Sequence, residues 1–518
     1  MDRNAINSST TAQERIKFDD PLIEKLYEYL SKKSESAYQD QLLLSNEVFG
    51  KSYLSISILN KYLEGKESIS IPFLFCLKKL THYFLKSLGW LFIFSMQNLA
   101  HLFSGQKFTV KTMGSITLID VFLVPEQIVE NGDICDRFFP GLEAKLKSIG
   151  TSYAYAPKFV GDKNPMLYYK MFRQMKLKNR SVLSSFQFLT FFDYLKMFMF
   201  IFVYPIRVFR QIGKLGSSRE DSFLRLFLWD SMSHVSVKNY ERQLFGKHIS
   251  KLKINSIKCI SWYENQPQDK NFYKGLRFNQ SDVKVYGAQL FPWPSTLLNY
   301  HIHKGDHNLR LIPDCILVNG PYFLKDDRGT GPNIKVGPSM RYSKLFNTQV
   351  NPKNKTAILI AMPFFEYEIE AILQILNKLD LSVEIFIKLH PGSNIKKYSR
   401  RIQGKMKLVE GDIYTFFEQV GCVIGMSTGA LVEATSLGIP AINIEIKGLN
   451  HKFLPEFGKG IIWENVSNEV ELRKWLKNFS NLLQTKPDLI RSIAERYKKM
   501  FFCEPTDTMI EEAFGLNE

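Results

Sequence analysis

The sequence lacks the cysteine patterns that support zinc sites and disulfide scaffolds. Its 518 residues include only six cysteines, and no two of them form a C-x-x-C pair. This scatter excludes a cysteine-based zinc site or disulfide framework and is typical of a reducing cytoplasm. The first residues are polar and contain no apolar run. We therefore expect no secretory signal there and a disordered tail over 1–20.

A clean apolar run of transmembrane length, about 20 residues, is also missing. Two segments, 72–104 and 186–215, come close, but Lys86 interrupts the first and Asp193 and Lys196 interrupt the second. Both are predicted to be helices that are very apolar on one side and basic at the edge. They are either ordinary buried helices or a peripheral contact with an anionic membrane surface.

Acidic residues are too few to balance the basic ones. Lysine and arginine number 68 against 51 aspartates and glutamates, which leaves a formal net charge of +17. Such an excess predicts an anionic partner: nucleic acid, anionic lipid or a phosphorylated substrate. The charge is dispersed, and we find no helix-turn-helix, RRM or zinc-finger pattern, so nucleic acid is not expected as a partner.

What the sequence does have is a long alternation of strand and helix patterns. Its length suggests two or three domains and its hydrophobic content of 45% suffices for a large core. Alternating strands and helices predict parallel sheets of βαβ units. We expect a GT-B-like α/β fold, with two Rossmann-like domains that face a central cleft and an extra helical N-terminal region. The predicted parts are an N-terminal, acceptor-side domain over 21–330, a linker over 331–355 rich in Gly, Pro and Asn, and a C-terminal nucleotide-sugar-binding domain over 356–518 with terminal helices.

One strand of the second series, 382–391, ends abruptly in the sequence IKLHPGSN. His390 is expected just past the carboxyl end of this strand, where ligands bind in open α/β sheets. Pro391 stops further strand pairing, and Gly392 lets the backbone approach a ligand closely. His390 can donate to a phosphate oxygen, or it can be a plain strand-end histidine.

A second strand, 421–427, ends in the sequence GMSTGALVEATSLGIPAINIE. Ser427, Thr428 and Gly429 form the predicted turn into a helix, whose N-terminus presents free N–H groups to an anion. Glu433 follows one turn later and could accept hydrogen bonds from ribose hydroxyls. These residues predict a phosphate and nucleotide site. Alternatively, the hydroxyls are a simple N-cap and Glu433 is a solvated helix residue.

These motifs resemble the C-terminal half of GT-B glycosyltransferases. A similar Ser/Thr-Gly-Glu-Gly-Pro pattern occurs in UDP-GlcNAc 2-epimerases and in polyol-phosphate polymerases of teichoic-acid type. The His-Pro and Ser/Thr combination is most similar to bacterial sialyltransferases, polysialyltransferases and β-Kdo transferases, which use CMP-activated sugars. In those families the corresponding residues hold the CMP phosphate, which implies that role for His390, Ser427 and Thr428. The stretch SWYENQPQDKNFYKGLRF and the strand after it resemble surface-carbohydrate biosynthesis proteins, so the likeness covers roughly 257–445.

A glycosyltransferase needs a base to deprotonate the acceptor hydroxyl. We choose Glu264, which ends a predicted strand over 257–264 on the acceptor side. Asn265, Gln266 and Gln289 are expected to offer hydrogen bonds to the sugar. The alternative is that Glu264 only caps the following helix, which has Pro267 in its first turn.

The histidines of the stretch NYHIHKGDH do not make a convincing metal site, because no cysteine or repeated carboxylate accompanies them. We expect neither a metal nor a cofactor. The predicted protein is an inverting, metal-independent glycosyltransferase that moves a sugar, such as Kdo or another CMP-activated acid sugar, to a glycan or lipid-linked glycan acceptor of capsule, lipopolysaccharide or O-antigen. It is expected in the cytoplasm, on the inner face of the membrane. The alternatives are an epimerase, a CDP-polyol phosphotransferase and a non-catalytic nucleotide-binding scaffold.

Overall fold

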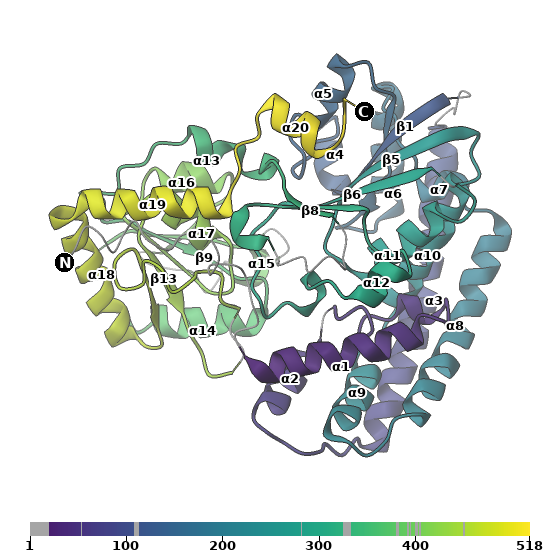
Figure 1. The fold of residues 1–518 in the computed structure, drawn as a ribbon, viewed down its shortest axis with the longest axis horizontal. Coiled ribbons are helices and arrows are strands. Elements are labelled where there is room, and N and C mark those ends of the chain that lie inside the picture. Colours follow the sequence, from purple (N-terminus) through teal and green to yellow (C-terminus); the bar gives the residue numbers. More distant parts are fainter. Residues whose placement is uncertain are drawn as a thin grey trace.

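The computed structural model describes residues 20–52, 54–107, 113–280, 282–324, 333–379, 383–390, 393, 395–398, 402, 406–448 and 451–517. Within them the chain forms two six-stranded sheets, each flanked by helices (Figure 1). Every strand pair in both sheets is parallel. The predicted α/β class, with two Rossmann-like domains and a helical N-terminal region, is confirmed. The predicted tail over 1–20 lies, except for Asp20, outside the described residues.

The first sheet has the strand order β3-β1-β5-β6-β7-β8. Its central strands are runs of β-branched and other apolar residues because helices cover both faces of a parallel sheet. A separate pair, β2 (Phe122–Leu123) and β4 (Lys158–Phe159), lies beside it. The six strands are β1 (Met113–Asp120), β3 (Tyr153–Tyr155), β5 (Ile254–Trp262), β6 (Val283–Gln289), β7 (Cys315–Val318) and β8 (Asn333–Val336).

The segment 331–355, which we expected to be a linker, instead contains regular structure. Strand β8 pairs with β7 at the edge of the first sheet, and the short helices η5 (Met340–Tyr342) and α13 (Ser343–Asn347) follow it. The side chains of β8 alternate between exposed and half-buried. An exposed edge strand of four residues has little apolar signal, and its Gly and Pro neighbours resemble a loop.

The second sheet has the order β11-β10-β9-β12-β13-β14. The predicted strands over 382–391 and 421–427 correspond to β10 and β12, and the centre of β14 is polar. The strands are β9 (Ile358–Ala361), β10 (Ile385–Lys388), β11 (Met406–Leu408), β12 (Cys422–Gly425), β13 (Ala441–Ile444) and β14 (Trp463–Val466). The helices between them are α14 (Glu366–Leu376), α15 (Ile395–Tyr398), α16 (Ile413–Phe417) and α17 (Ala430–Ser436).

The first domain carries most of the helices. The segment 220–248 forms two helices, α9 and α10, and the Ser233 hydroxyl accepts from the backbone N–H of Val235 at the start of the second. The α-helices of the first domain up to β7 are α1 (Pro21–Ala37), α2 (Ile56–Leu63), α3 (Phe73–Ser104), α4 (Pro125–Asn131), α5 (Leu142–Ser148), α6 (Pro165–Leu177), α7 (Ser185–Phe188), α8 (Phe191–Gly213), α9 (Arg219–Asp230), α10 (Val235–Ile249), α11 (Pro267–Leu276) and α12 (Lys304–Asn308).

The two apolar segments form the long helices α3 and α8, which lie side by side at one end of the molecule (Figure 1). The Asn98 amide of α3 donates to the Tyr194 hydroxyl of α8 over 2.6 Å. Both helices also carry a row of large exposed apolar side chains. The row comprises Phe73, Leu74, Leu77, Leu85, Leu88, Phe92, Leu99, Leu102, Phe103, Phe191, Phe192, Leu195, Phe198, Met199, Phe202 and Ile206. No helix in the described part of the chain is long and apolar enough to cross a bilayer.

The end of the chain returns to the first domain. After α18 (Glu469–Thr485) and α19 (Pro487–Phe501), helix α20 (Asp507–Ala513) lies against α5 (Figure 1). Lys145 pairs there with Asp507 over 2.9 Å and with Glu511 over 2.5 Å. Such long-range pairing leaves no periodic signal in the sequence.

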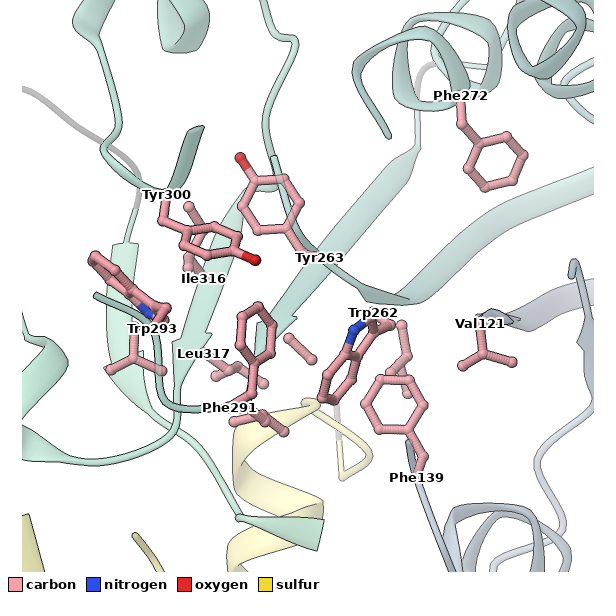
Figure 2. Close-up of a cluster of buried hydrophobic side chains, with 14 of the residues drawn as sticks. Val121, Phe139, Trp262, Tyr263, Phe272, Phe291, Trp293, Tyr300, Ile316 and Leu317 are labelled. Atoms are coloured by element: carbon pink, nitrogen blue, oxygen red, sulfur yellow. The ribbon is translucent and has the colours of Figure 1, made fainter. Parts of the chain in front are cut away.

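Aromatic side chains fill the first domain at the carboxyl ends of its strands (Figure 2). The rings of Trp262 and Phe291 lie 5.0 Å apart, and Phe291 contacts Tyr300 at 5.3 Å. Each buried ring of this size contributes about 1.5–3 kcal/mol. The cluster therefore forms a rigid wall under the loop that follows β5.

Candidate functional site

His390 and Ser427 lie at the same edge of the second sheet. His390 follows β10 by two residues and Ser427 follows β12 by two, and β9 lies between these parallel strands. The Ser393 N–H donates to the His390 carbonyl over 2.8 Å, which closes the turn after the strand. The His390 ring packs edge-on against Phe364, with 5.2 Å between centroids. Pro391 and Gly392 lie outside the described residues.

The Ser427 hydroxyl is turned toward a buried carboxylate. It donates to Glu368 Oε1 over 2.6 Å, and Tyr367 donates to the same oxygen over 3.3 Å. Glu368 is fully buried and its Oε2 has no hydrogen-bond partner among the described residues. Burial raises the pKa of Glu368. Ser427 itself has a left-handed backbone with φ of 49°, which is uncommon outside glycine.

The turn into α17 is only partly capped. Thr428 Oγ1 accepts from the Ala430 N–H over 3.3 Å, and the N-cap residue Gly429 makes no side-chain bond. Glu433, one turn further, accepts a hydrogen bond of 2.7 Å from Tyr414. Burial raises the pKa of Glu433 to about 7. Near neutral pH this carboxyl can therefore both accept and donate hydrogen bonds, which suits a ribose hydroxyl.

Glu264 lies two residues past the end of β5, in the first domain. Its carboxylate accepts from Trp262 Nε1 over 3.1 Å and from Gln266 Nε2 over 2.6 Å. Burial, and then the negative charge of Asp269, raises the pKa of Glu264. A held carboxylate with a raised pKa is a stronger base, as proton abstraction requires.

The cap of α11 is made by other residues than Glu264. Gln266 and Asp269 form a capping box, and Asp269 Oδ2 accepts from the backbone N–H of Glu264 over 3.2 Å and of Gln266 over 3.1 Å. The Glu264 carboxylate takes no part in this cap. Lys158 pairs with Asp269 over 2.6 Å and completes the support of the loop.

The other three predicted sugar-binding residues are buried. Asn265 has a left-handed φ of 52° and its amide donates to the Asn299 carbonyl, so it stabilises the loop that presents Glu264. Gln266 bonds directly to the Glu264 carboxylate. Gln289 ends β6, and its Nε2 has no hydrogen-bond partner among the described residues. Gln289 therefore retains an unused donor at the carboxyl edge of the first sheet.

Arg341 is a residue that the sequence analysis missed. It lies on η5, after β8, and its guanidinium is 5.6 Å from the Phe138 ring centroid and 5.7 Å from that of Trp262. The side chain is exposed and forms no hydrogen bond or ion pair with the described residues. In the sequence it looked like one more solvated charge in a linker.

The charge of Arg341 acts on candidate residues of both domains. It lowers the pKa of His390, after the larger effect of burial, and it opposes the raised pKa of Glu264 and of Glu433. Arg341 therefore contributes to the electrostatics of candidate residues at both sheet edges. The side chains of Thr296 and His451 also link the two domains, with 2.7 Å between Thr296 Oγ1 and His451 Nδ1.

The histidines of 301–307 are engaged in the fold. His301 Nε2 lies 2.8 Å from the Ser295 carbonyl, and His303 Nδ1 accepts from the Gly305 N–H over 3.1 Å at the start of α12. Over the part of the chain that the structure describes, no group of three or more His, Cys, Asp or Glu side chains could hold a metal ion.

Comparison with known proteins concerns the fold. No family model matches the chain, and no curated protein does. Among solved structures, MurG of Acinetobacter baumannii matches with 10% identity over 77% of this chain and 98% of its own, with a TM-score of 0.37. UDP-GlcNAc 2-epimerase of Neisseria meningitidis, bound to UDP-GlcNAc, matches with 12% identity over 77% and 98%, with a TM-score of 0.35. The wall teichoic acid polymerase TagF matches with 11% identity over 85% and 96%, with a TM-score of 0.36. At these values the likeness bears on the fold alone.

Proposed function

We propose that the protein is a GT-B glycosyltransferase that moves a sugar from a nucleotide donor to a carbohydrate acceptor. The proposal is carried by the electrostatics of groups on both sheets. The charge of Arg341 acts on Glu264, a carboxylate of raised pKa on the first sheet, and on His390 and Glu433 of the second sheet. A transfer between two substrates needs groups of these kinds on both sides.

The donor is held by the second domain in this proposal. His390 and Arg341 contact the phosphate, and Glu433 contacts the ribose. The other nucleotide-binding residues are Pro391, Gly392, Ser427, Thr428 and Gly429. The His-Pro and Ser/Thr pair favours a CMP-activated acid sugar such as Kdo. The positive charge of Arg341 beside His390 offsets the charge of the leaving phosphate, so the reaction needs no metal ion.

Glu264 is the proposed base. It takes the proton of the acceptor hydroxyl while the phosphate leaves on the opposite face of the sugar, which inverts the anomeric centre. Gln266 orients the carboxylate through the 2.6 Å bond to Oε2. Gln289 and Asn265 belong to the acceptor side, Gln289 with its unused amide donor and Asn265 as support of the loop.

A binding panel tests the class of reaction. Thermal shifts are measured with CMP, CDP, UDP and GDP and with their sugar conjugates. A shift with CMP and CMP-sugars supports the proposal, and transfer is then followed as release of CMP in the presence of glycan acceptors. Conversion of UDP-GlcNAc in the absence of an acceptor would instead indicate an epimerase. A preference for CDP-polyols would indicate a phosphotransferase. The absence of a thermal shift with every nucleotide would indicate a non-catalytic scaffold.

We also propose that the protein works on the inner face of the cytoplasmic membrane. The exposed apolar row of α3 and α8 is bordered by basic side chains, among them Lys78, Lys196 and Arg210, and α3 contains no acidic residue. A lipid-linked glycan acceptor would then lie within reach of the site. Each basic residue at an anionic surface adds about 1 kcal/mol.

Flotation with liposomes tests the membrane contact. Protein should float with anionic vesicles at low salt, less so at high salt, and less with zwitterionic vesicles. The double substitution F198S/F202S, on the exposed face of α8, should reduce flotation, whereas F364S, an exposed phenylalanine of the second domain, should not. Absence of flotation with anionic vesicles at low salt would contradict the proposal.

A further inference from the structure

A cavity of ≈ 240 Å³ lies in the first domain where α3, α10 and the segment after β4 meet. One wall is aromatic and comes from Trp90 and Phe94 of α3 together with Phe186 of α7. The other wall carries cations: Lys163, Lys238 and Arg242. A pocket that combines an apolar wall with several cations suits an amphiphilic anion.

Of the cations that line this cavity, Lys158 and Arg242 pair with buried aspartates, whereas Lys163 and Lys238 form no ion pair with the described residues. Lys238 is half-buried and forms no hydrogen bond or ion pair with the described residues. Burial and then the charge of Lys163 lower the pKa of Lys238 to about 8. Burial and the charges of Lys238, Lys163 and Lys86 lower the pKa of His234 to about 4. Cations that repel one another in this way would be stabilised by a bound anion.

Arg242 contributes further to this wall. It is almost fully buried, and its terminal nitrogens bond to Asp120 over 2.9 Å and to the Pro157 carbonyl over 3.3 Å. Its Nε has no hydrogen-bond partner among the described residues. Glu241 also lines the cavity, and burial raises its pKa. Among the described residues that line the cavity, the cations therefore outnumber the carboxylates.

The cavity connects the apolar row to the proposed base. Helix α3 supplies both the aromatic wall and a large part of the exposed row. On the other side, Gln268 lines the cavity and donates to Gln266 Oε1 over 2.8 Å, and Gln266 donates to Glu264 Oε2 over 2.6 Å. A ligand in the cavity would thus lie next to the membrane-facing helix and a short chain of contacts away from Glu264.

We propose that this cavity binds the phosphate group of a lipid-linked acceptor, with Lys238, Lys163 and Arg242 as its ligands and the aromatic wall against the first carbons of the lipid. The inference rests on the proposed function, because it assigns the acceptor of that reaction. The shared chemistry is an organic phosphate, which could come from a lipid headgroup or from a soluble sugar phosphate. The lipid source is favoured by the aromatic wall and by the neighbouring apolar row.

Titration calorimetry tests the inference on the full chain without a nucleotide donor. The probes are decyl phosphate, decanol, inorganic phosphate and glucose 1-phosphate, each below its aggregation concentration. We expect decyl phosphate to bind at one site. Decanol and inorganic phosphate should bind at least about tenfold more weakly, because each lacks one half of the recognition. Tightest binding of glucose 1-phosphate would overturn the lipid source.

Variants locate the binding. Lys238→Met should weaken the binding of decyl phosphate by roughly tenfold or more, which is the usual effect of losing a charged hydrogen bond. Lys163→Met, at an exposed position, should weaken this binding in the same direction. The control is Lys247→Met, which removes a cation from the same helix outside the cavity. Unchanged binding in both cavity variants, or an equal loss in the control, would overturn the proposal.

The outcome is separable from that of the proposed function. Nucleotide binding is measured on the same variants and should be unchanged, because His390, Ser427 and Glu433 belong to the other domain. Decyl phosphate binding without any nucleotide binding would contradict the transferase and leave the cavity assigned. Nucleotide binding without decyl phosphate binding would contradict the assignment of the cavity and leave the proposed transferase standing.

Discussion

Replacement of Arg341 by methionine tests whether the two sheet edges form one site. Methionine retains much of the apolar stem beside the Phe138 and Trp262 rings, at 5.6 and 5.7 Å from the original guanidinium, while it removes the charge. Arg341 is exposed and has no polar partner among the described residues. The stability of the protein should therefore change little, within about 0.5 kcal/mol for a surface substitution.

The expected loss is in donor binding. A charge-assisted hydrogen bond to phosphate contributes about 1.5–3 kcal/mol, so nucleotide affinity should fall roughly 10- to 100-fold. The pH dependence should shift as well. Because Arg341 lowers the pKa of His390, Glu264 and Glu433, its removal raises all three. A base acts when it is deprotonated, so the acid limb of kcat/KM should move to higher pH.

Calorimetry with the preferred nucleotide and a pH profile of transfer are the measurements. Arg491→Met is the matched control, because Arg491 is an exposed arginine of the second domain whose side chain is 74% accessible. The reasoning is refuted if Arg341→Met binds nucleotide as tightly as the wild type and its acid limb does not move. An equal loss in the control would show a general effect of charge.

The remaining predictions concern single residues of the site. His390→Ala should fold normally but lose most nucleotide affinity and turnover. The control His307→Ala, at an exposed position, should retain both. Unchanged CMP binding in His390→Ala would contradict the role of His390. Glu264→Gln should retain donor affinity and lose turnover by about 10²–10⁴-fold, and transfer at the wild-type rate would exclude Glu264 as the base. Glu433 has a folded-state pKa near 7, above its ordinary value, so its contribution to stability is complete at low pH and is lost as pH rises through that value. Glu433→Gln has no carboxyl to ionise and so lacks this loss. The difference in unfolding free energy between the variant and the wild type should therefore grow in favour of the variant by up to about 3 kcal/mol as the pH rises from 4 to 8. A difference that does not change with pH would contradict the assignment.

Local sequence patterns were sufficient to predict much of the fold. The apolar runs ILIA of β9 and CVIG of β12 are completely buried strands, and the alternation of such runs with amphipathic helices was sufficient to predict two parallel sheets. The polar residues that follow β10 and β12 also pointed to one sheet edge, since parallel strands place their carboxyl ends together. Weak elements escaped this reasoning: β8 and β14 are strands of four residues at sheet edges, the side chains of β8 alternate between exposed and half-buried, and the centre of β14 is polar.

By itself the sequence determined the fold class, the long apolar helices and the placement of His390 and Ser427 after parallel strands of one sheet, because each depends on local strand and helix patterns. Only the tertiary structure decided what lies across the domains. It placed Arg341 against the rings of Phe138 and Trp262, where its charge acts on Glu264, His390 and Glu433. It also turned the Ser427 hydroxyl to Glu368 and gathered Lys163, Lys238 and Arg242 around one cavity. These groups are far apart in the sequence, and the electrostatic energy that couples them depends on distance in space, which no local pattern records.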